Sequence, residues 1–305
     1  MRRIKHKGFL IALVSALIIS SSFIACDMKG NAENEKANLE NNTEKNETSS
    51  NKENSTDNTN EKSNNDSNSE TNKNRFEGLK TTSEDMNIPV LCYHDVTPKN
   101  PNNNELLVNP EKFKEQLQYL KDNNYTPITL DELYDYLRNN KPLPEKPVVI
   151  TFDDGYKGNY EYAYPLLKEF KFPATVFVIS NYVGASDFMT ADQLKEMSNN
   201  GIEIESHTFK HDDLSTLDEA KQLETLKDSK VNLEKIIEKP VDFVAYPFGR
   251  YNSSTRVAAE KAGYKLGFNL NGNFADRKDN NFNIDRIYVS NNDSLKKFES
   301  RLTGK

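Results

Sequence analysis

Two histidines and an acidic pair are the residues whose types and spacing could support chemistry. His207 and His211 are four residues apart, a spacing that predicts both imidazoles on one face of a helical turn. Asp153 and Asp154 are adjacent and precede Gly155, so the two carboxylates point in different directions and can have different roles. Two imidazoles and one carboxylate suit Zn²⁺, or another divalent ion such as Co²⁺, Ni²⁺ or Fe²⁺. Such an ion can activate water and polarise a carbonyl group for hydrolysis.

Each pattern has a simpler explanation when it is taken alone. The segment 152–155 could be a turn that caps a helix, and many His-x-x-x-His pairs bind no metal. The two patterns support each other because each follows a predicted strand of one parallel fold. The carboxyl ends of the strands are where (β/α) barrels place their catalytic groups. We therefore favour the metal site.

Alternating apolar and amphipathic segments predict the elements that position these residues. Strands are expected at 88–93, 147–152, 174–180, 202–206, 242–246, 265–270 and 284–290. Helices are expected from 110 onward and at 130–139, 159–170, 190–200, 218–238, 253–262 and 294–302. About seven strands alternating with helices predict an α/β fold, either a distorted (β/α) barrel of parallel strands or a doubly wound sheet.

The first 26 residues have the features of a lipoprotein signal peptide. Four cations lie within residues 2–7, and a run of apolar and small residues, 8–25, leads to Cys26. An Ala before this Cys resembles a lipobox, which predicts lipidation of Cys26. An uncleaved membrane helix is the alternative. Either anchor predicts a protein held at the outer face of a bacterial cytoplasmic membrane.

Residues 27–85 are predicted to be a disordered linker rich in Asn, Glu, Lys and Ser. No apolar residue occurs from 40 to 75, so this segment cannot bury enough surface to offset its ordering entropy. Residues 86–305 are then the catalytic domain. The chain carries a net charge of −7 and its domain has no basic stretch, so we expect no nucleic acid as partner. Two cysteines cannot build a disulfide framework.

Three segments resemble successive motifs of the polysaccharide deacetylases, carbohydrate esterase family four. They are 151–155 (TFDDG), 206–211 (SHTFKH) and 246–249 (YPFG), within a resemblance that covers about 88–290. The resemblance implies a distorted (β/α) barrel, one divalent metal and hydrolysis of an acetyl group. Zinc is the ion we favour. We expect a monomer.

The resemblance also implies roles for particular residues. Asp153 would be the general base, and Asp154, His207 and His211 would be the metal ligands. The backbone N–H of Phe248 would help to stabilise the oxyanion. We further assign Tyr246, Pro247 and Arg286 to substrate binding.

Two departures from the family pattern bear on the general acid and on the branch. Many members have an Arg where this chain has Ala245, and they take the general acid from a late His, whereas no His follows His211. His94, at the end of the first strand, is the remaining histidine of the domain, and first and last strands are neighbours in a closed barrel. We therefore predict His94 as general acid, with simple packing as the alternative. Arg286 could supply the charge missing at Ala245.

The Tyr-His pair on the first strand is most similar to the poly-β-1,6-N-acetylglucosamine deacetylase branch. The expected reaction is metal-dependent N-deacetylation of N-acetylglucosamine in a cell-surface polysaccharide, with release of acetate. Peptidoglycan and, more distantly, acetylated xylan are alternative substrates. A non-catalytic carbohydrate-binding lipoprotein and an iron oxygenase, which also uses two His and a carboxylate, are alternative classes.

Overall fold

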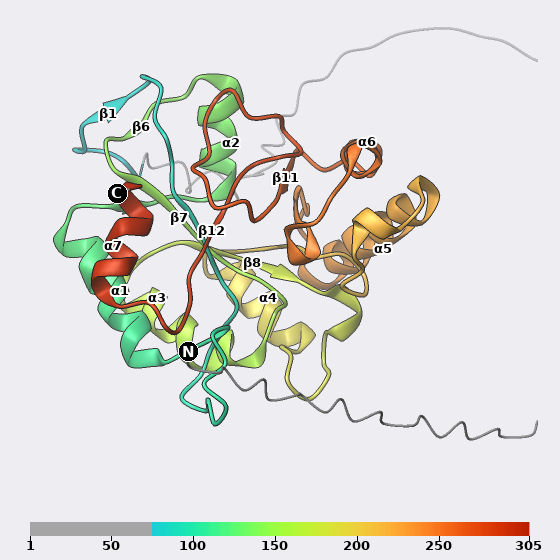
Figure 1. Cartoon of the computed structure of the whole chain (residues 1–305), viewed down its shortest axis with the longest axis horizontal. Coiled ribbons are helices and arrows are strands. Elements are labelled where there is room, and N and C mark those ends of the chain that lie inside the picture. The colour runs from blue at the N-terminus through green and yellow to red at the C-terminus, as the bar shows by residue number, and fades with distance from the viewer. Residues whose placement is uncertain (1–74, 305) are drawn as a thin grey trace, which may run out of the picture. The chain divides into compact units, whose positions relative to one another are not determined.

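The computed structural model describes residues 75–304, shown in Figure 1. The expected signal peptide, Cys26 and residues 27–74 of the expected linker lie outside the described residues. Among residues 75–304, no helix is both long enough and apolar enough to cross a membrane.

Seven parallel strands form one curled sheet at the centre of the domain (Figure 1). Their order across the sheet is β11-β10-β9-β8-β7-β2-β12, and a short strand, β5 (Thr126–Pro127), also pairs with β7. The seven strands are β2 (Val90–Tyr93), β7 (Pro147–Phe152), β8 (Ala174–Val178), β9 (Ile202–Ser206), β10 (Phe243–Ala245), β11 (Leu266–Phe268) and β12 (Ile287–Tyr288). This confirms the predicted distorted barrel of about seven parallel strands.

The sheet is buried on both faces, as a parallel sheet covered by helices must be. Every residue of β7 is buried. Val148, Ile150 and Phe152 belong to one hydrophobic cluster, together with side chains from the surrounding helices, whereas Val149 belongs to a second cluster. Successive residues of a strand point to opposite faces, so a continuous apolar run fills both.

Helices surround the curled sheet in Figure 1. They are α1 (Pro110–Asp122), α2 (Leu130–Asn139), α3 (Tyr164–Phe170), α4 (Ala191–Asn199), α5 (Glu219–Ile237), α6 (Ser253–Lys261) and α7 (Leu295–Thr303). Several of these helices begin at the positions that their N-cap residues predict. Asn109 caps α1, and capping boxes at Thr129 and Thr190 open α2 and α4, since these side chains bond otherwise free backbone N–H groups.

The helix expected at 159–170 differs in its first part. Residues Asn159–Ala163 form a π-helical turn, and the α-helix begins only at Tyr164. Pro165 lies in the first turn of α3. Its ring lacks an N–H and would clash with the carbonyl four residues earlier in a regular α-helix, so the wider turn is accommodated before it.

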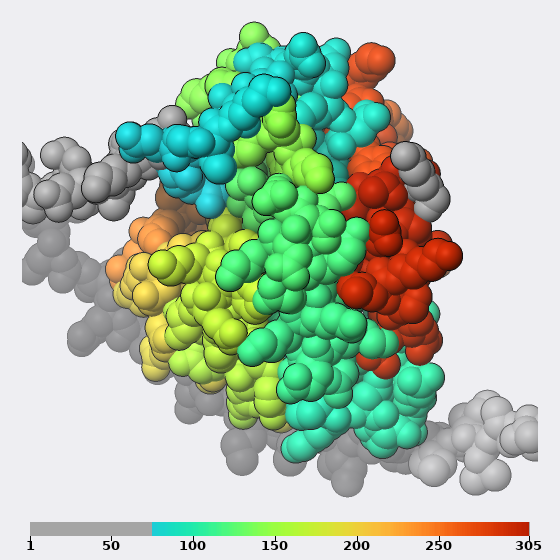
Figure 2. Space-filling model, turned by 90° about the vertical axis from the view of Figure 1, so that its left-hand side faces the viewer, coloured from blue at the N-terminus to red at the C-terminus, as the bar shows by residue number. Residues whose placement is uncertain are grey.

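The predicted boundary between linker and domain at residue 85 is wrong. Thr81–Thr82 form β1, which pairs antiparallel with β6 (Leu143–Pro144). Nη2 of Arg75 lies 2.6 Å from an oxygen of Glu132 and 2.7 Å from the carbonyl oxygen of Pro127. Figure 2 shows these N-terminal residues, in blue, lying on the domain. Backbone pairing and three ion pairs, made by Arg75, Lys80 and Asp85, hold a segment whose composition alone predicts disorder.

The strands β2 and β12, which are the first and last of this sheet in chain order, are neighbours. Tyr288 of β12 is in register with Cys92 of β2. A parallel bridge also joins Ile284, which precedes β12, to Phe268 of β11. The C-terminal helix α7 packs beside α1 (Figure 2). The ring centroids of Tyr119 on α1 and Phe298 on α7 are 6.1 Å apart. Two short parallel strands, β3 (Asp95–Val96) and β4 (Leu107–Val108), follow β2. This closure brings late residues to the end of the first strand.

Candidate active site

The acidic pair lies at the carboxyl end of β7 and is buried. Asp153 is 3% exposed and Asp154 is 6% exposed. Asp154 (φ 72°) and Gly155 (φ +83°) are both in the left-handed region, which glycine adopts without steric cost. A Cβ at Gly155 would lie only 3.1 Å from Val178. The turn therefore needs this glycine, and it directs the two carboxylates to different partners.

Asp154, His207 and His211 meet at one point and fit a divalent metal ion. Oδ1 of Asp154 is 3.5 Å from Nε2 of His207 and 3.3 Å from Nε2 of His211. Zinc bonds of about 2.0–2.1 Å in tetrahedral geometry place ligand atoms roughly 3.3 Å apart. This Oδ1 is buried without a hydrogen-bond partner among the described residues. Buried polar atoms are nearly always satisfied, so a cation at this point would complete the site.

The orientation of His207 leaves the correct ring nitrogen for a metal. Its Nδ1 lies 2.9 Å from the carbonyl oxygen of Ala245. A neutral imidazole that donates from Nδ1 has its lone pair on Nε2, the atom that faces Asp154. Metal-binding histidines commonly use such a second hydrogen bond to fix ring and tautomer. The backbone of β10 therefore orients His207, which directly follows β9.

The prediction that His207 and His211 lie on a helical turn is wrong. The residues after β9 form an irregular loop, in which Thr208 (φ 65°) and His211 (φ 61°) are in the left-handed region. The two imidazole centroids are nevertheless 5.0 Å apart. Backbone N–H groups of Ser180 and Asn181 donate to the carbonyls of Thr208 and Phe209. Neighbouring loops, rather than a helix, bring the ligands together.

Burial favours the neutral forms of His207, His211 and Asp154. Burial, and next the charge of Asp153, raise the pKa of Asp154 to about 7. Burial lowers the pKa of His207 to about 3 and also lowers that of His211. Two neutral imidazoles are ready to bind a metal. A cation would also stabilise the ionised form of Asp154.

Arg286 binds the other member of the acidic pair. Its Nη1 and Nη2 lie 2.6 Å and 2.7 Å from the two carboxylate oxygens of Asp153. Burial alone would raise the pKa of Asp153, but the charge of Arg286, with His207 and a direct hydrogen bond, holds it well below its usual range. Asp153 is therefore ionised, and its Oδ2 is 4.0 Å from Nε2 of His207. It can accept a proton beside the metal site.

The assignment of Arg286 to substrate binding needs correction. Its side chain is fully buried and also bonds Oγ1 of Thr151 and the carbonyl oxygen of Asn269. It cannot reach a polymer. The other expectation for Arg286 was that it supplies the positive charge that is missing at Ala245. Its ion pair with Asp153 agrees with that expectation.

We expect Arg286→Met to destabilise the domain by about 3–5 kcal/mol, because it leaves the buried Asp153 carboxylate unpaired. Urea unfolding measures the change. The matched control is Lys261→Met, which removes the exposed Lys261–Glu219 ion pair and should cost at most about 1 kcal/mol. Equal effects of the two substitutions would contradict a structural role for the buried pair.

His94 lies at the site, as predicted. Ligand atoms of Cys92, His94 and Asp153 all lie within 4.8 Å of one another. Nδ1 of His94 has no hydrogen-bond partner among the described residues. Burial lowers the pKa of His94, and the charge of Asp153 opposes this shift. One ring nitrogen of His94 is therefore not held by a hydrogen bond from the described residues, and the side chain lies beside Asp153.

Sequence reasoning missed the contact of Cys92 with Asp153. Sγ of Cys92 lies 3.4 Å from Oδ2 of Asp153, and burial raises the pKa of this thiol well above its usual value. A neutral thiol can donate to the carboxylate. The signal was its position two residues before His94 on a strand, since such residues share a face.

Phe248 is at the site, but the other two residues assigned from its motif are not available to substrate. Phe248 is 58% exposed, and its ring lies edge-on to His211, with centroids 4.6 Å apart. Tyr246 is fully buried, its hydroxyl donating to the carbonyl of Phe282, and Pro247 is buried as well. Assigning Tyr246 and Pro247 to substrate binding was therefore wrong.

Backbone conformations of positive φ are concentrated at the site. Of the nine non-glycine residues with positive φ among those described, four belong to it: Asp154, Thr208, His211 and Phe248. Such conformations cost about 1–3 kcal/mol each and persist where the surroundings enforce them. At Gly249, a Cβ would lie 2.6 Å from Leu270, so the turn that carries Phe248 is also fixed by a close approach.

The fold and the site together define a class: a curled parallel α/β sheet whose strand ends hold a His-His-Asp cation site beside an ionised aspartate. Comparison with known proteins gives the family. The family model for polysaccharide deacetylase matches residues 140–267. The candidate polysaccharide deacetylase YxkH of Bacillus subtilis is 37% identical over 209 residues, 68% of this chain and 74% of that protein.

Two further relatives agree with this match. A poly-β-1,6-N-acetyl-D-glucosamine N-deacetylase of Staphylococcus aureus is 34% identical over 197 residues, 60% of this chain and 68% of that protein. The structure of the Streptococcus pyogenes deacetylase PplD in complex with acetate superposes with a TM-score of 0.68 at 34% identity, covering 72% of this chain and 99% of that chain. The protein therefore belongs to the polysaccharide deacetylase family.

Proposed function

We propose that the protein removes acetyl groups from N-acetylglucosamine units of a cell-surface polysaccharide, with the β-1,6-linked polymer favoured. The observation that carries this proposal is the ionised Asp153, held by Arg286 4.0 Å from a ligand of the Asp154–His207–His211 site. A purely binding protein has no need for an unprotonated carboxylate at this place. The Staphylococcus aureus relative supports the choice of polymer.

A divalent cation held by Asp154, His207 and His211 would polarise the acetamide carbonyl and lower the pKa of a water molecule. Asp153 accepts a proton from the attacking water. The backbone N–H of Phe248 donates to the oxygen on which negative charge develops. Its placement depends on the tight turn formed by the Gly249 and Arg250 N–H groups, which donate to Tyr246 and Pro247.

His94 completes the reaction by donating a proton to the sugar nitrogen as the carbon–nitrogen bond breaks. The water oxygen remains on the acetyl carbon, so the products are acetate and a free glucosamine amine. Asp153 lies within 4.8 Å of His94 and of the thiol of Cys92. A proton accepted by Asp153 is thus close to His94, the group that must supply a proton to the sugar nitrogen.

We expect His94→Ala to lower kcat by about 10²-fold or more, because protonation of the leaving amine loses its donor. Acetate release measures the rate. Metal content should be unchanged, since His94 is outside the Asp154–His207–His211 group. Turnover close to that of the wild type would instead assign His94 to packing against Tyr288, whose ring centroid is 5.8 Å away.

We propose zinc as the bound ion. Two imidazoles and one carboxylate, with room for a further ligand, are typical of catalytic zinc sites. Cobalt, nickel and iron suit the same donors. Metal analysis of protein purified without added metal, followed by reconstitution of EDTA-treated enzyme with each ion, tests this choice. Full activity with iron and none with zinc would contradict it.

The function is tested by acetate release from β-1,6-linked N-acetylglucosamine oligomers and from peptidoglycan, assayed side by side with EDTA controls. Faster release from the β-1,6 oligomers is expected. Faster release from peptidoglycan would keep the reaction and change the substrate. Metal binding without acetate release from either polymer would indicate a carbohydrate-binding protein.

We also propose that Cys26 is lipidated and that the domain acts as a monomer on the outer face of the cytoplasmic membrane. The basic, apolar and Cys-ending N-terminal segment supports the anchor. Replacing Cys26 by Ser should release the protein from the membrane fraction.

Light scattering of the domain should give the mass of one chain, and a stable dimer would contradict the monomer.

A further inference from the structure

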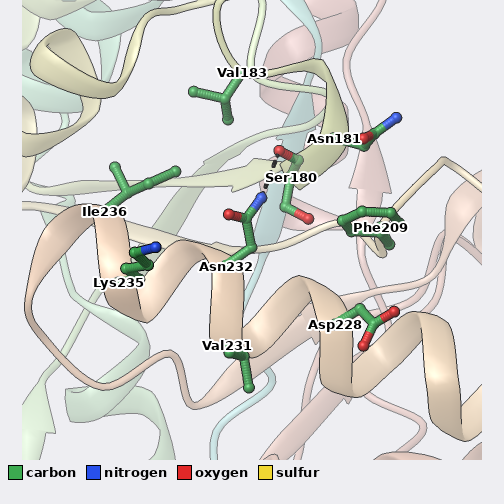
Figure 3. A pocket seen from close by; sticks show the side chains of 9 residues that line it. All are labelled: Ser180, Asn181, Val183, Phe209, Asp228, Val231, Asn232, Lys235 and Ile236. Atoms are coloured by element: carbon green, nitrogen blue, oxygen red, sulfur yellow. Dashed lines mark hydrogen bonds between the residues drawn. The ribbon is translucent and has the colours of Figure 1, made fainter. Parts of the chain in front are cut away.

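A groove along α5, outside the reaction centre, suggests how a polymer is held. Its main hollow has a volume of about 620 Å³ and lies between α5 and the segment after β8 (Figure 3). A second hollow of about 280 Å³ is lined by residues on the N-terminal side of the same helix. Phe209 and Asp228 line both hollows, so the depression continues along the helix on both sides of Phe209.

The groove begins at the loop that carries the metal ligands. Phe209 lies midway between His207 and His211 in the sequence. Its backbone carbonyl accepts from the N–H of Asn181 at 3.0 Å, and its own N–H donates to Oγ1 of Thr225 on α5 at 3.2 Å. The backbone of one residue thus ties the metal loop to both walls of the groove, while its ring lines the hollow in Figure 3.

The lining combines apolar surface with a few oriented polar groups. Val231, 65% exposed, and Ile236 lie on α5 and, with Phe209, give apolar contact area. The amide of Asn232 is fixed because its Nδ2 donates to the carbonyl of Ser180 at 3.0 Å (Figure 3). Binding sites of this size typically have mostly apolar walls with a small number of placed polar groups.

We propose that this groove binds sugar units of the same polysaccharide, several units away from the one being deacetylated. This inference rests on the proposed function. A β-linked hexosamine presents an apolar ring face together with hydroxyl and acetamide groups, which match Phe209, Val231 and the Asn232 amide. A polymer must continue past the reacting unit, and this groove starts at the metal loop.

The test compares acetate release from a disaccharide and a hexasaccharide of β-1,6-linked N-acetylglucosamine. Val231→Arg should lower kcat/KM for the hexasaccharide about 10-fold, through KM, because a long cation obstructs an exposed apolar wall. The disaccharide should change less than about twofold. The matched control is Val257→Arg, on α6, where Val257 is also exposed, at 40%, and both substrates should be processed as in the wild type.

The outcomes separate this inference from the proposed function. Equal kcat/KM for the hexasaccharide in wild type and Val231→Arg overturns the groove, even if acetate is released. Equal losses with both substrates also overturn it, because they indicate damage to the reaction centre. No acetate from any oligomer with wild-type enzyme rejects the proposed function. Calorimetric titration of EDTA-treated protein then tests the groove alone, and hexasaccharide binding that is lost only in Val231→Arg would support it.

Discussion

Asp153→Asn should lower kcat by ~10²–10⁴-fold while leaving the bound metal in place. The amide keeps the shape of the side chain but cannot accept the proton of the attacking water, and removal of a general base typically has an effect of this size. Metal content should be retained because the proposed ligands are Asp154, His207 and His211. Acetate release and metal analysis on the same preparation measure both properties.

A buried Arg286 that loses its anionic partner can also destabilise the fold, so a control for this effect is needed. Asp293→Asn provides it, because Asp293 is a buried aspartate (7% exposed) that likewise binds an arginine, Arg301, at 2.6 Å and 3.0 Å. Both variants should lose stability to urea, but only Asp153→Asn should lose turnover per folded molecule. Retained turnover in Asp153→Asn would exclude it as the base.

His207→Ala should abolish stoichiometric metal binding and lower activity by roughly 10³-fold or more. Metal ions contribute several kcal/mol of transition-state stabilisation, and each 1.36 kcal/mol corresponds to a factor of ten. His207 is 1% exposed, and its Nδ1 is bonded to the carbonyl oxygen of Ala245 while its Nε2 faces Asp154, so the substitution removes one of the three proposed ligand atoms. Elemental analysis and acetate release measure the result.

Wild-type protein treated with EDTA should regain activity when the metal is restored, whereas His207→Ala should not. Asp212→Asn is the matched control in the same loop. Its carboxylate accepts from Oγ1 of Thr225 at 2.7 Å and is outside the cation group, so this variant should keep its metal. Metal loss in Asp212→Asn as well would mean that the loop, rather than the ligand, had been disturbed.

Much of the fold was predictable because its signals are local. The continuous apolar run at β7, the cap residues Asn109, Thr129 and Thr190, and the alternation of strands with helices all depend on neighbours in the chain. Such signals failed where distant contacts decide. The end of the predicted linker pairs with β6 instead, and only the folded domain provides that partner.

The sequence by itself determined which residues can bind a metal and the strand ends that carry them, and the resemblance of its motifs implied Asp153 as the base. The tertiary structure decided the partners. Arg286 reaches Asp153 from 133 residues away, Cys92 contacts the same carboxylate, and His211 approaches Asp154 through a loop that is not helical. The physical reason is that hydrogen bonds and ion pairs act over a few ångströms, so they depend on how the sheet curls to bring β12 beside β2. The spacing of two residues along the chain does not give the distance between their side chains in the folded domain.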